Sequence, residues 1–168
     1  KITCSTLLGE RYISPIVRRF CQDYPKVEVT MDLSNRLVDL IAEGFDLAIR
    51  TGRLEDSRLI SSRVATRQFL VCTSPAYLEA HGMPQRLDDL KAHNCLIGSS
   101  SSWRFKIGSK HETLRPRGNW RCNSAASVLD GLLAGTGIGQ LPLFYVLPYL
   151  QSGALVELFE DYHPEPEP

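Results

Sequence analysis

The residues best suited to bind a small molecule come directly after predicted strands. Each of four buried segments is followed by hydroxyl, amide or guanidinium groups: Ser5 and Thr6, Ser34 and Asn35, Arg50 and Thr51, and Asn123 and Ser124. In open α/β sheets, ligands bind beyond the carboxyl ends of strands, where helix N-termini direct N–H groups toward an anion. Each residue taken singly could equally be a helix cap. Together they predict a polar binding site.

Two larger side chains extend this set. Arg50 favours an anionic ligand, although its guanidinium could instead pair with a neighbouring carboxylate. Trp103 and Phe105 fit the core of a strand, but Trp103 also follows the polar run 99–102, whose hydroxyls could line a ligand site with it. Both alternatives for Trp103 stay open at the level of sequence.

The motifs that would indicate catalysis or a cofactor are missing from the sequence. The glycines of 135–139 follow a predicted helix and precede a strand, which is the reverse of a dinucleotide fingerprint. The histidines lie near turns, no Gly-x-Ser-x-Gly elbow occurs, and no His or Cys pair has the close spacing of a zinc site. We therefore expect neither an enzyme nor a bound metal or cofactor.

The charged residues and the cysteines limit the partners and the cellular compartment that we expect for this chain. The 168 residues carry 19 basic and 19 acidic side chains, with no concentrated basic face, so this chain alone should not bind nucleic acid. The five cysteines are odd in number and form no C-x-x-C pair, which favours a reducing cytoplasm. No apolar run is long enough to span a membrane, and Lys1 opens the chain without a signal peptide.

The first fifty residues alternate between strand and helix patterns. The predicted elements are a strand over 1–6, a helix ended by Tyr24-Pro25, a strand over 27–33, a helix carrying Leu37, Val38, Leu40 and Ile41 between Ser34 and Gly44, and a strand over 45–50. Such alternation predicts a parallel sheet with helices on its faces.

The pattern resumes in the rest of the chain. It predicts strands over 59–64, 69–72, 95–97, 103–107, 119–122, 138–141 and 155–159, and helices over 76–81, 87–93, 125–134 and 143–150. The tail 163–168 has nothing to bury. We expect two α/β lobes, one of residues 1–73 plus 142–168 and one of residues 74–141, joined by two crossover strands and binding a ligand between them.

Five blocks of sequence, in this order and spacing, carry a family resemblance. They are Pro15-Ile-Val-Arg-Arg-Phe with Tyr24-Pro25 and Val27-Glu-Val; Asp39-Leu-Ile-Ala-Glu-Gly-Phe-Asp-Leu-Ala-Ile-Arg-Thr-Gly52; Cys72-Thr-Ser-Pro-Ala-Tyr-Leu78 with Gly82 and Pro84; Leu87-Asp-Asp-Leu90 with His93-Asn-Cys-Leu96; and Leu132-Leu-Ala-Gly-Thr-Gly-Ile-Gly-Gln-Leu-Pro142. With these blocks the chain resembles the effector-binding domain of LysR-type transcriptional regulators over nearly its whole length.

The resemblance implies a fold similar to type 2 periplasmic binding proteins, with two Rossmann-like lobes and a small-molecule effector between them. It further implies a homodimer, or a tetramer in the full-length regulator, in which the helix of 12–24 packs on that of 125–134. DNA would be bound only by a winged helix-turn-helix domain N-terminal to Lys1. The family's effector site falls on Ser5, Thr6, Ser34, Arg50, Thr51, Trp103, Asn123 and Ser124.

Two other classes remain as alternatives. A solute-binding protein of a transporter shares the architecture but would need export, which unpaired cysteines disfavour. A small α/β hydrolase or transferase would need a nucleophile motif that the sequence lacks.

Overall fold

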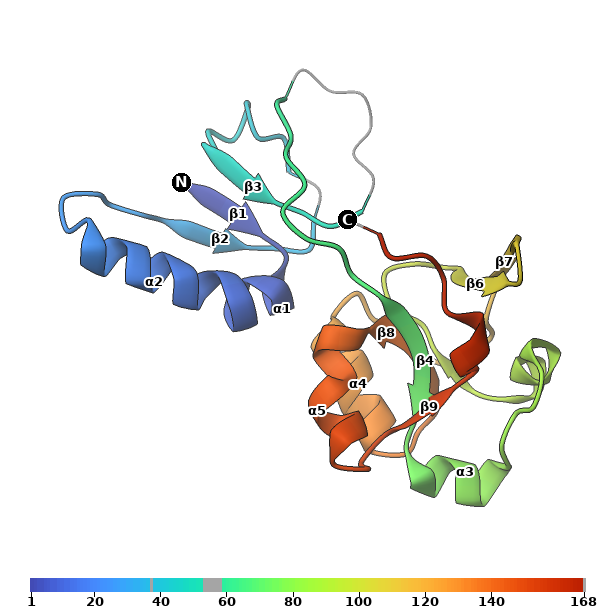
Figure 1. Cartoon of the computed structure of the whole chain (residues 1–168). Coiled ribbons are helices and arrows are strands. Elements are labelled where there is room, and N and C mark those ends of the chain that lie inside the picture. Colours follow the sequence, from blue (N-terminus) through green and yellow to red (C-terminus); the bar gives the residue numbers. More distant parts are fainter. Residues whose placement is uncertain (37, 53–58, 168) are drawn as a thin grey trace. The chain divides into compact units, whose positions relative to one another are not determined.

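The computed structural model describes residues 1–36, 38–52 and 59–167. Contacts within the chain divide it into two compact units, Lys1–Gly52 and Arg53–Pro168 (Figure 1). Each unit combines strands with helices, so the predicted α/β class is confirmed.

A parallel three-stranded sheet forms the centre of the first unit. Its strands are β1 (Ile2–Cys4), β2 (Met31–Leu33) and β3 (Leu47–Ile49), in the order β2-β1-β3. Cys4 is in register with both Leu33 and Ile49, so the three strands end at the same level. The predicted parallel sheet is therefore confirmed, although each strand is shorter than its pattern.

One helical segment connects β1 to β2. It consists of α1 (Thr6–Leu8), a π-helical turn η1 (Gly9–Ile13) and α2 (Ser14–Asp23), and it ends at Tyr24 before Pro25 as predicted. The turn passes so close to the sheet that a Cβ at position 9 would lie 2.3 Å from a Leu33 methyl carbon, so any larger residue there would have to displace the Leu33 side chain.

The helix predicted to begin after Ser34 is not formed in the described residues 38–44, which make turns instead; Leu37 lies outside the described residues. The Asp39 carboxylate accepts hydrogen bonds from the backbone N–H groups of Ile41 and Ala42, at 3.1 and 3.0 Å. These bonds offer the backbone a local alternative to a helix. Gly44 ends the turn in a left-handed conformation, with φ of 65°.

The second unit is built on a mixed sheet in the order β5-β8-β4-β9. Its strands are β4 (Phe69–Thr73), β5 (Cys95–Leu96), β8 (Ile138–Pro142) and β9 (Val156–Leu158), and β6 (Trp103–Ile107) pairs with β7 (Lys110–Leu114) in a separate hairpin. The helices are α3 (Pro75–His81), α4 (Ala125–Leu133) and α5 (Leu143–Gln151), with 3₁₀ turns η2 (Leu87–Ala92) and η3 (Glu160–Tyr162). Ser74 and Ser124 cap α3 and α4 with their side chains.

Two of the strands predicted for this unit are not formed, and one observed strand was not predicted. The stretch 59–64 contains no strand, and 119–122 contributes only an isolated bridge from Arg121 to Ile97. Conversely, β7 is a strand that the sequence does not indicate, because four of its five residues are polar and exposed and only Leu114 is partly buried. Alternation of apolar residues cannot reveal an edge strand whose partner supplies the apolar face.

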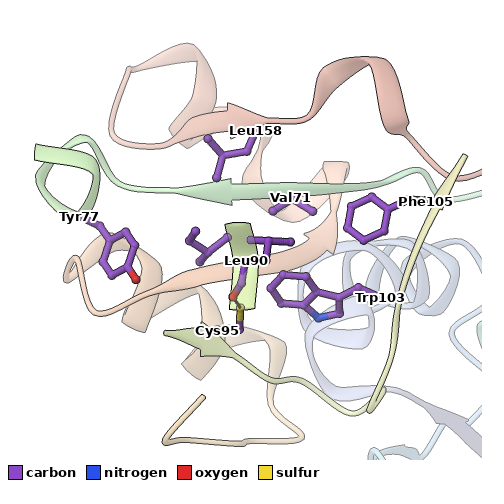
Figure 2. Close-up of a cluster of buried hydrophobic side chains, with 8 residues drawn as sticks. Val71, Tyr77, Leu90, Cys95, Trp103, Phe105 and Leu158 are labelled. Atoms are coloured by element: carbon purple, nitrogen blue, oxygen red, sulfur yellow. Dashed lines mark hydrogen bonds between the residues drawn. The ribbon is translucent and has the colours of Figure 1, made fainter. Parts of the chain in front are cut away.

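The core of the second unit collects side chains from sheet, hairpin and helices. Val71, Tyr77, Leu90, Cys95, Trp103, Phe105, Ile138 and Leu158 are all at most 4% exposed (Figure 2). Trp103 is 2% exposed, as expected for the core of a strand.

The C-terminal tail is more tightly held than predicted. Glu167 is 9% exposed; its backbone pairs with that of Arg67, and its carboxylate forms ion pairs with Arg67 and Arg104. Two guanidinium groups can compensate for the cost of burying one carboxylate. The tail, which was expected to bury no side chain, therefore buries a charged one.

Both β9 and α5 contact strands of the second unit, so residues 142–168 belong to the same compact unit as the residues before them. The predicted division of the chain into lobes of residues 1–73 plus 142–168 and residues 74–141 stays a prediction.

Candidate functional site

The carboxyl edge of the parallel sheet brings three of the predicted residues to one level. Ser5, Ser34 and Arg50 each follow the last residue of a strand, and the register of Cys4 with Leu33 and Ile49 aligns them. All three are half-buried. The sequence prediction of neighbouring strand-end residues is thus confirmed within this unit, while their role in binding stays a prediction.

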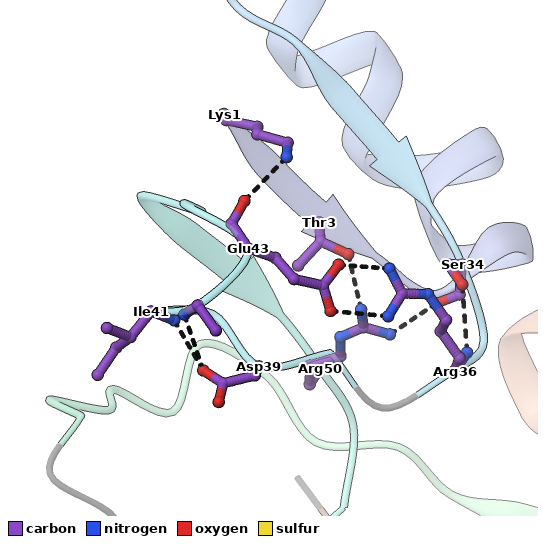
Figure 3. Close-up of polar contacts among 9 residues, drawn as sticks. Lys1, Thr3, Ser34, Arg36, Asp39, Ile41, Glu43 and Arg50 are labelled. Atoms are coloured by element: carbon purple, nitrogen blue, oxygen red, sulfur yellow. Dashed lines mark hydrogen bonds and ion pairs between the residues drawn. The ribbon is translucent and has the colours of Figure 1, made fainter.

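Arg50 is engaged by its own unit. Its two terminal nitrogens donate to the backbone oxygen of Ser34 and to Oγ1 of Thr3, each at 2.6 Å (Figure 3). Thr3 is completely buried, so this guanidinium satisfies a hydroxyl that water cannot reach. Arg50 therefore joins the ends of β1 and β2, and among the described residues it forms no ion pair with a carboxylate.

The start of the helical segment is capped from a distance. Ser5 occupies the N-cap position, but its side chain makes no capping hydrogen bond. Instead the backbone N–H of Thr6 donates to Oδ1 of Asn35, at 3.0 Å. Asn35 lies 29 residues along the chain, at the end of β2, so no local pattern could assign it this role.

Ser34 has a different local role from the predicted helix cap. Its hydroxyl accepts a hydrogen bond from the backbone N–H of Arg36, at 3.3 Å, which closes a tight turn. The Arg36 side chain forms a two-pronged ion pair with Glu43 (Figure 3), and this contact holds the pKa of the Glu43 carboxyl below its ordinary value. Thr51, the remaining predicted residue of this unit, is exposed beyond β3.

The other three predicted residues belong to the second unit. The Ser124 hydroxyl accepts from the backbone N–H of Ser127 at 3.4 Å, which confirms its capping role. The backbone oxygen of Asn123 accepts a hydrogen bond from the Ser99 hydroxyl at 3.3 Å, so the polar run 99–102 contacts the chain just before α4. Trp103 is buried in the core, and a role in ligand binding for it stays a prediction.

The five cysteines are free thiols. Burial raises the pKa of Cys72 to about 12 and that of Cys95 to about 11, so both remain protonated and unreactive near neutral pH. In the part of the chain that the structure describes, no three His, Cys, Asp or Glu side chains gather closely enough to hold a metal ion.

Comparison with known proteins decides the family. The LysR substrate binding domain family matches residues 1–167. The chain belongs to this family. An HTH-type transcriptional regulator of Haemophilus influenzae is 33% identical over 92% of the chain, and the probable regulator LtrA of Klebsiella pneumoniae is 32% identical over 96%. The chain covers 55% and 54% of these proteins, so this LysR substrate-binding domain spans about half the length of the curated relatives it matches.

Solved structures agree with this assignment. The regulatory domain of AphB from Vibrio vulnificus superposes with a TM-score of 0.86 at 26% identity, covering 99% of this chain and 85% of that one. The regulatory domain of CrgA from Neisseria meningitidis gives 0.85 at 25% identity, with coverage of 99% and 84%. These neighbours are regulatory domains of transcription regulators, and none of them supports the alternative of a transporter's solute-binding protein.

No helix among the described residues has both the length and the apolar character that crossing a membrane requires.

Proposed function

We propose that this LysR substrate-binding domain is the effector-sensing and dimerising part of a transcription regulator. The carrying observation is the common level at which Ser5, Ser34 and Arg50 leave a parallel sheet, in a chain whose relatives are HTH-type transcriptional regulators. In this proposal a small metabolite is bound by Ser5, Thr6, Ser34 and Thr51 together with Asn123 and Ser124 of the second unit, and Trp103 lines the same site. Arg50 braces the sheet edge beneath the ligand.

The chemical class of the effector follows from the polar groups at the strand ends that are not already used in hydrogen bonds within the unit. Arg50 already donates to Thr3 and Ser34, and the first helical N–H already donates to Asn35. Recognition therefore depends mainly on serine and threonine hydroxyls, which bind carboxylates and neutral hydroxyl compounds alike. An anionic effector remains part of the proposal, with its charge balanced by the nearby Arg50 guanidinium at longer range.

Dimerisation is proposed through α2, packed against α4 of a second subunit. The residues Tyr12, Ile16, Phe20 and Tyr24 recur every four positions, so they lie on one helix face, and they are 41 to 63% exposed. The rings of Phe20 and Tyr24 contact each other in a tilted arrangement, with centroids 4.7 Å apart. An exposed apolar stripe of this kind is typical of an interaction surface.

The other assignments concern the whole regulator. DNA contact belongs to a winged helix-turn-helix domain that precedes Lys1, and a balanced net charge gives this chain little attraction for phosphates. The cytoplasm is the proposed location, since five free thiols are stable in a reducing compartment.

A thermal-unfolding screen tests the sensing role. The purified 168-residue chain is heated with members of a metabolite library, and a specific effector is expected to raise the melting temperature in a dose-dependent, saturable way. A library that covers carboxylates, sugars and amino acids without producing any saturable shift would count against the proposal.

A further inference from the structure

A pocket in the second unit is lined by none of the strand-end residues. It has a volume of about 520 Å³ and lies between η2, the hairpin of β6 and β7, and η3. This volume is within the usual range for small-molecule sites. None of Ser5, Ser34, Arg50, Asn123 or Ser124 lines it.

The floor of the pocket is apolar. Phe105 is 2% exposed and belongs to the core, while Leu87, Leu114 and Tyr162 pack against that core from its edge. Phe159 supports the floor from behind, because its ring meets Phe105 edge-on and stacks on Tyr162. A bound apolar group would therefore rest on rings and side chains that are already fixed by packing.

Most of the charges around the pocket are neutralised locally. Lys91 Nζ lies 2.6 Å from a carboxylate oxygen of Asp88, and this contact holds the pKa of Asp88 below its ordinary value. Arg86 forms an ion pair with Asp89, at 3.5 Å. These four charges cancel, so they favour no particular sign of ligand.

Two opposite charges are left over. Glu112 stands directly across the hairpin from Phe105, which places its carboxylate on the face that turns toward the apolar floor. Arg115 follows Leu114 at the end of the same strand. Both line the pocket, and neither side chain forms a hydrogen bond or ion pair with any residue that the structure describes.

We propose that this pocket binds a small zwitterion with an apolar body, such as an aromatic α-amino acid. Glu112 receives its ammonium group, Arg115 receives its carboxylate, and its side chain packs on Phe105, Leu114 and Tyr162. A simple anion would meet the unpaired Glu112 and a simple cation the unpaired Arg115, so a zwitterion matches the pocket better than either. The site is separate from the effector site proposed above and does not depend on it.

Three related compounds test the charge requirement on the 168-residue chain by two-dimensional NMR titration. L-Phenylalanine carries both charges, 3-phenylpropionate lacks the ammonium group, and phenethylamine lacks the carboxylate. L-Phenylalanine is expected to bind with the lowest Kd of the three and to shift signals of β6, β7 and η2. Failure to bind L-phenylalanine even at about 10 mM would overturn the proposal, as would binding no tighter than either single-charge compound.

Variants then assign the charges. Glu112→Gln should raise the Kd of L-phenylalanine about fivefold without raising the Kd of 3-phenylpropionate. Arg115→Gln should raise the Kd of L-phenylalanine by a similar factor without raising the Kd of phenethylamine. Glu79→Gln and Arg117→Gln are matched controls, because each removes the same charge at an exposed position outside the pocket. An unchanged Kd in both pocket variants, or equal losses in the controls, would overturn the assignment.

Discussion

Arg50 shows how a residue with the right chemistry for a ligand can be used for structure. Its guanidinium satisfies a buried hydroxyl and a backbone carbonyl, and both would be left without a donor if it were removed. Lysine at this position could not bridge both acceptors, because it is a point charge without a planar fork. The sequence could place Arg50 at the sheet edge but could not show its partners, since Thr3 and Ser34 come from two other strands.

Arg50→Lys is accordingly expected to lower the free energy of unfolding by about 1–3 kcal/mol in urea denaturation. Arg36→Lys is the control, since the Arg36–Glu43 pair is solvent-exposed and little change is expected there. Equal stability of the wild type and Arg50→Lys would contradict the bracing role.

The buried thiol of Cys72 makes stability depend on alkaline pH. Its folded pKa of about 12 lies above the ordinary value of 9.0, so between these values the unfolded chain releases a proton that the folded chain retains. This contribution is fully present below pH 9 and falls by about 1.4 kcal/mol per pH unit above it. Urea unfolding at about pH 8 and about pH 10.5 should show a smaller loss in Cys72→Ala than in the wild type. Equal losses of stability in the wild type and in Cys72→Ala would contradict this contribution of the Cys72 thiol.

Among the elements, those with a clear apolar period were predictable and those held by remote partners were not. The helices over 125–133 and 143–151 and the strand over 138–142 appear close to their predicted bounds, because their own residues supply the apolar pattern and, for the first helix, the cap as well. The segment after Ser34 has a helical pattern, yet Asp39 holds it in a turn. At the strand ends, Asn35 could be recognised as polar, but its capping of Thr6 depends on the folded sheet.

The C-terminal tail departs most from its sequence-based prediction, because Glu167 is buried between two arginines. Glu167→Gln should lower the free energy of unfolding by about 1.5–3 kcal/mol, because Arg67 and Arg104 lose a shared, largely buried anion. Glu165→Gln provides the control, since Glu165 pairs with Lys106 at an exposed position. If both variants unfold at the same urea concentration, the tail does not depend on the buried charge.

At the scale of the whole molecule, the exposed stripe of α2 is the surface through which we propose that two copies of this domain assemble. Ile16 is 63% exposed, so Ile16→Glu should leave the fold of a single chain intact while placing two charges in a two-fold contact. Sedimentation should show a dimer for the wild type and a monomer for Ile16→Glu, with Gln22→Glu, at an exposed position of the same helix, still dimeric. A wild type that stays monomeric at high concentration, or a dimer that tolerates Ile16→Glu, would contradict an α2 interface.

The proposed effector site draws strand-end residues from both units, and the ligand-induced shift in melting temperature is the measurement that decides whether they bind one effector. At about a hundred times its Kd, an effector found in the screen should stabilise the wild type by about 2.7 kcal/mol, or about 5–10 °C. Asn123→Leu and Ser5→Asp should each keep the fold yet lose most of that shift, with Ser5→Asp doing so for an anionic effector. A shift that survives in both variants would show that the effector binds elsewhere and would contradict the account.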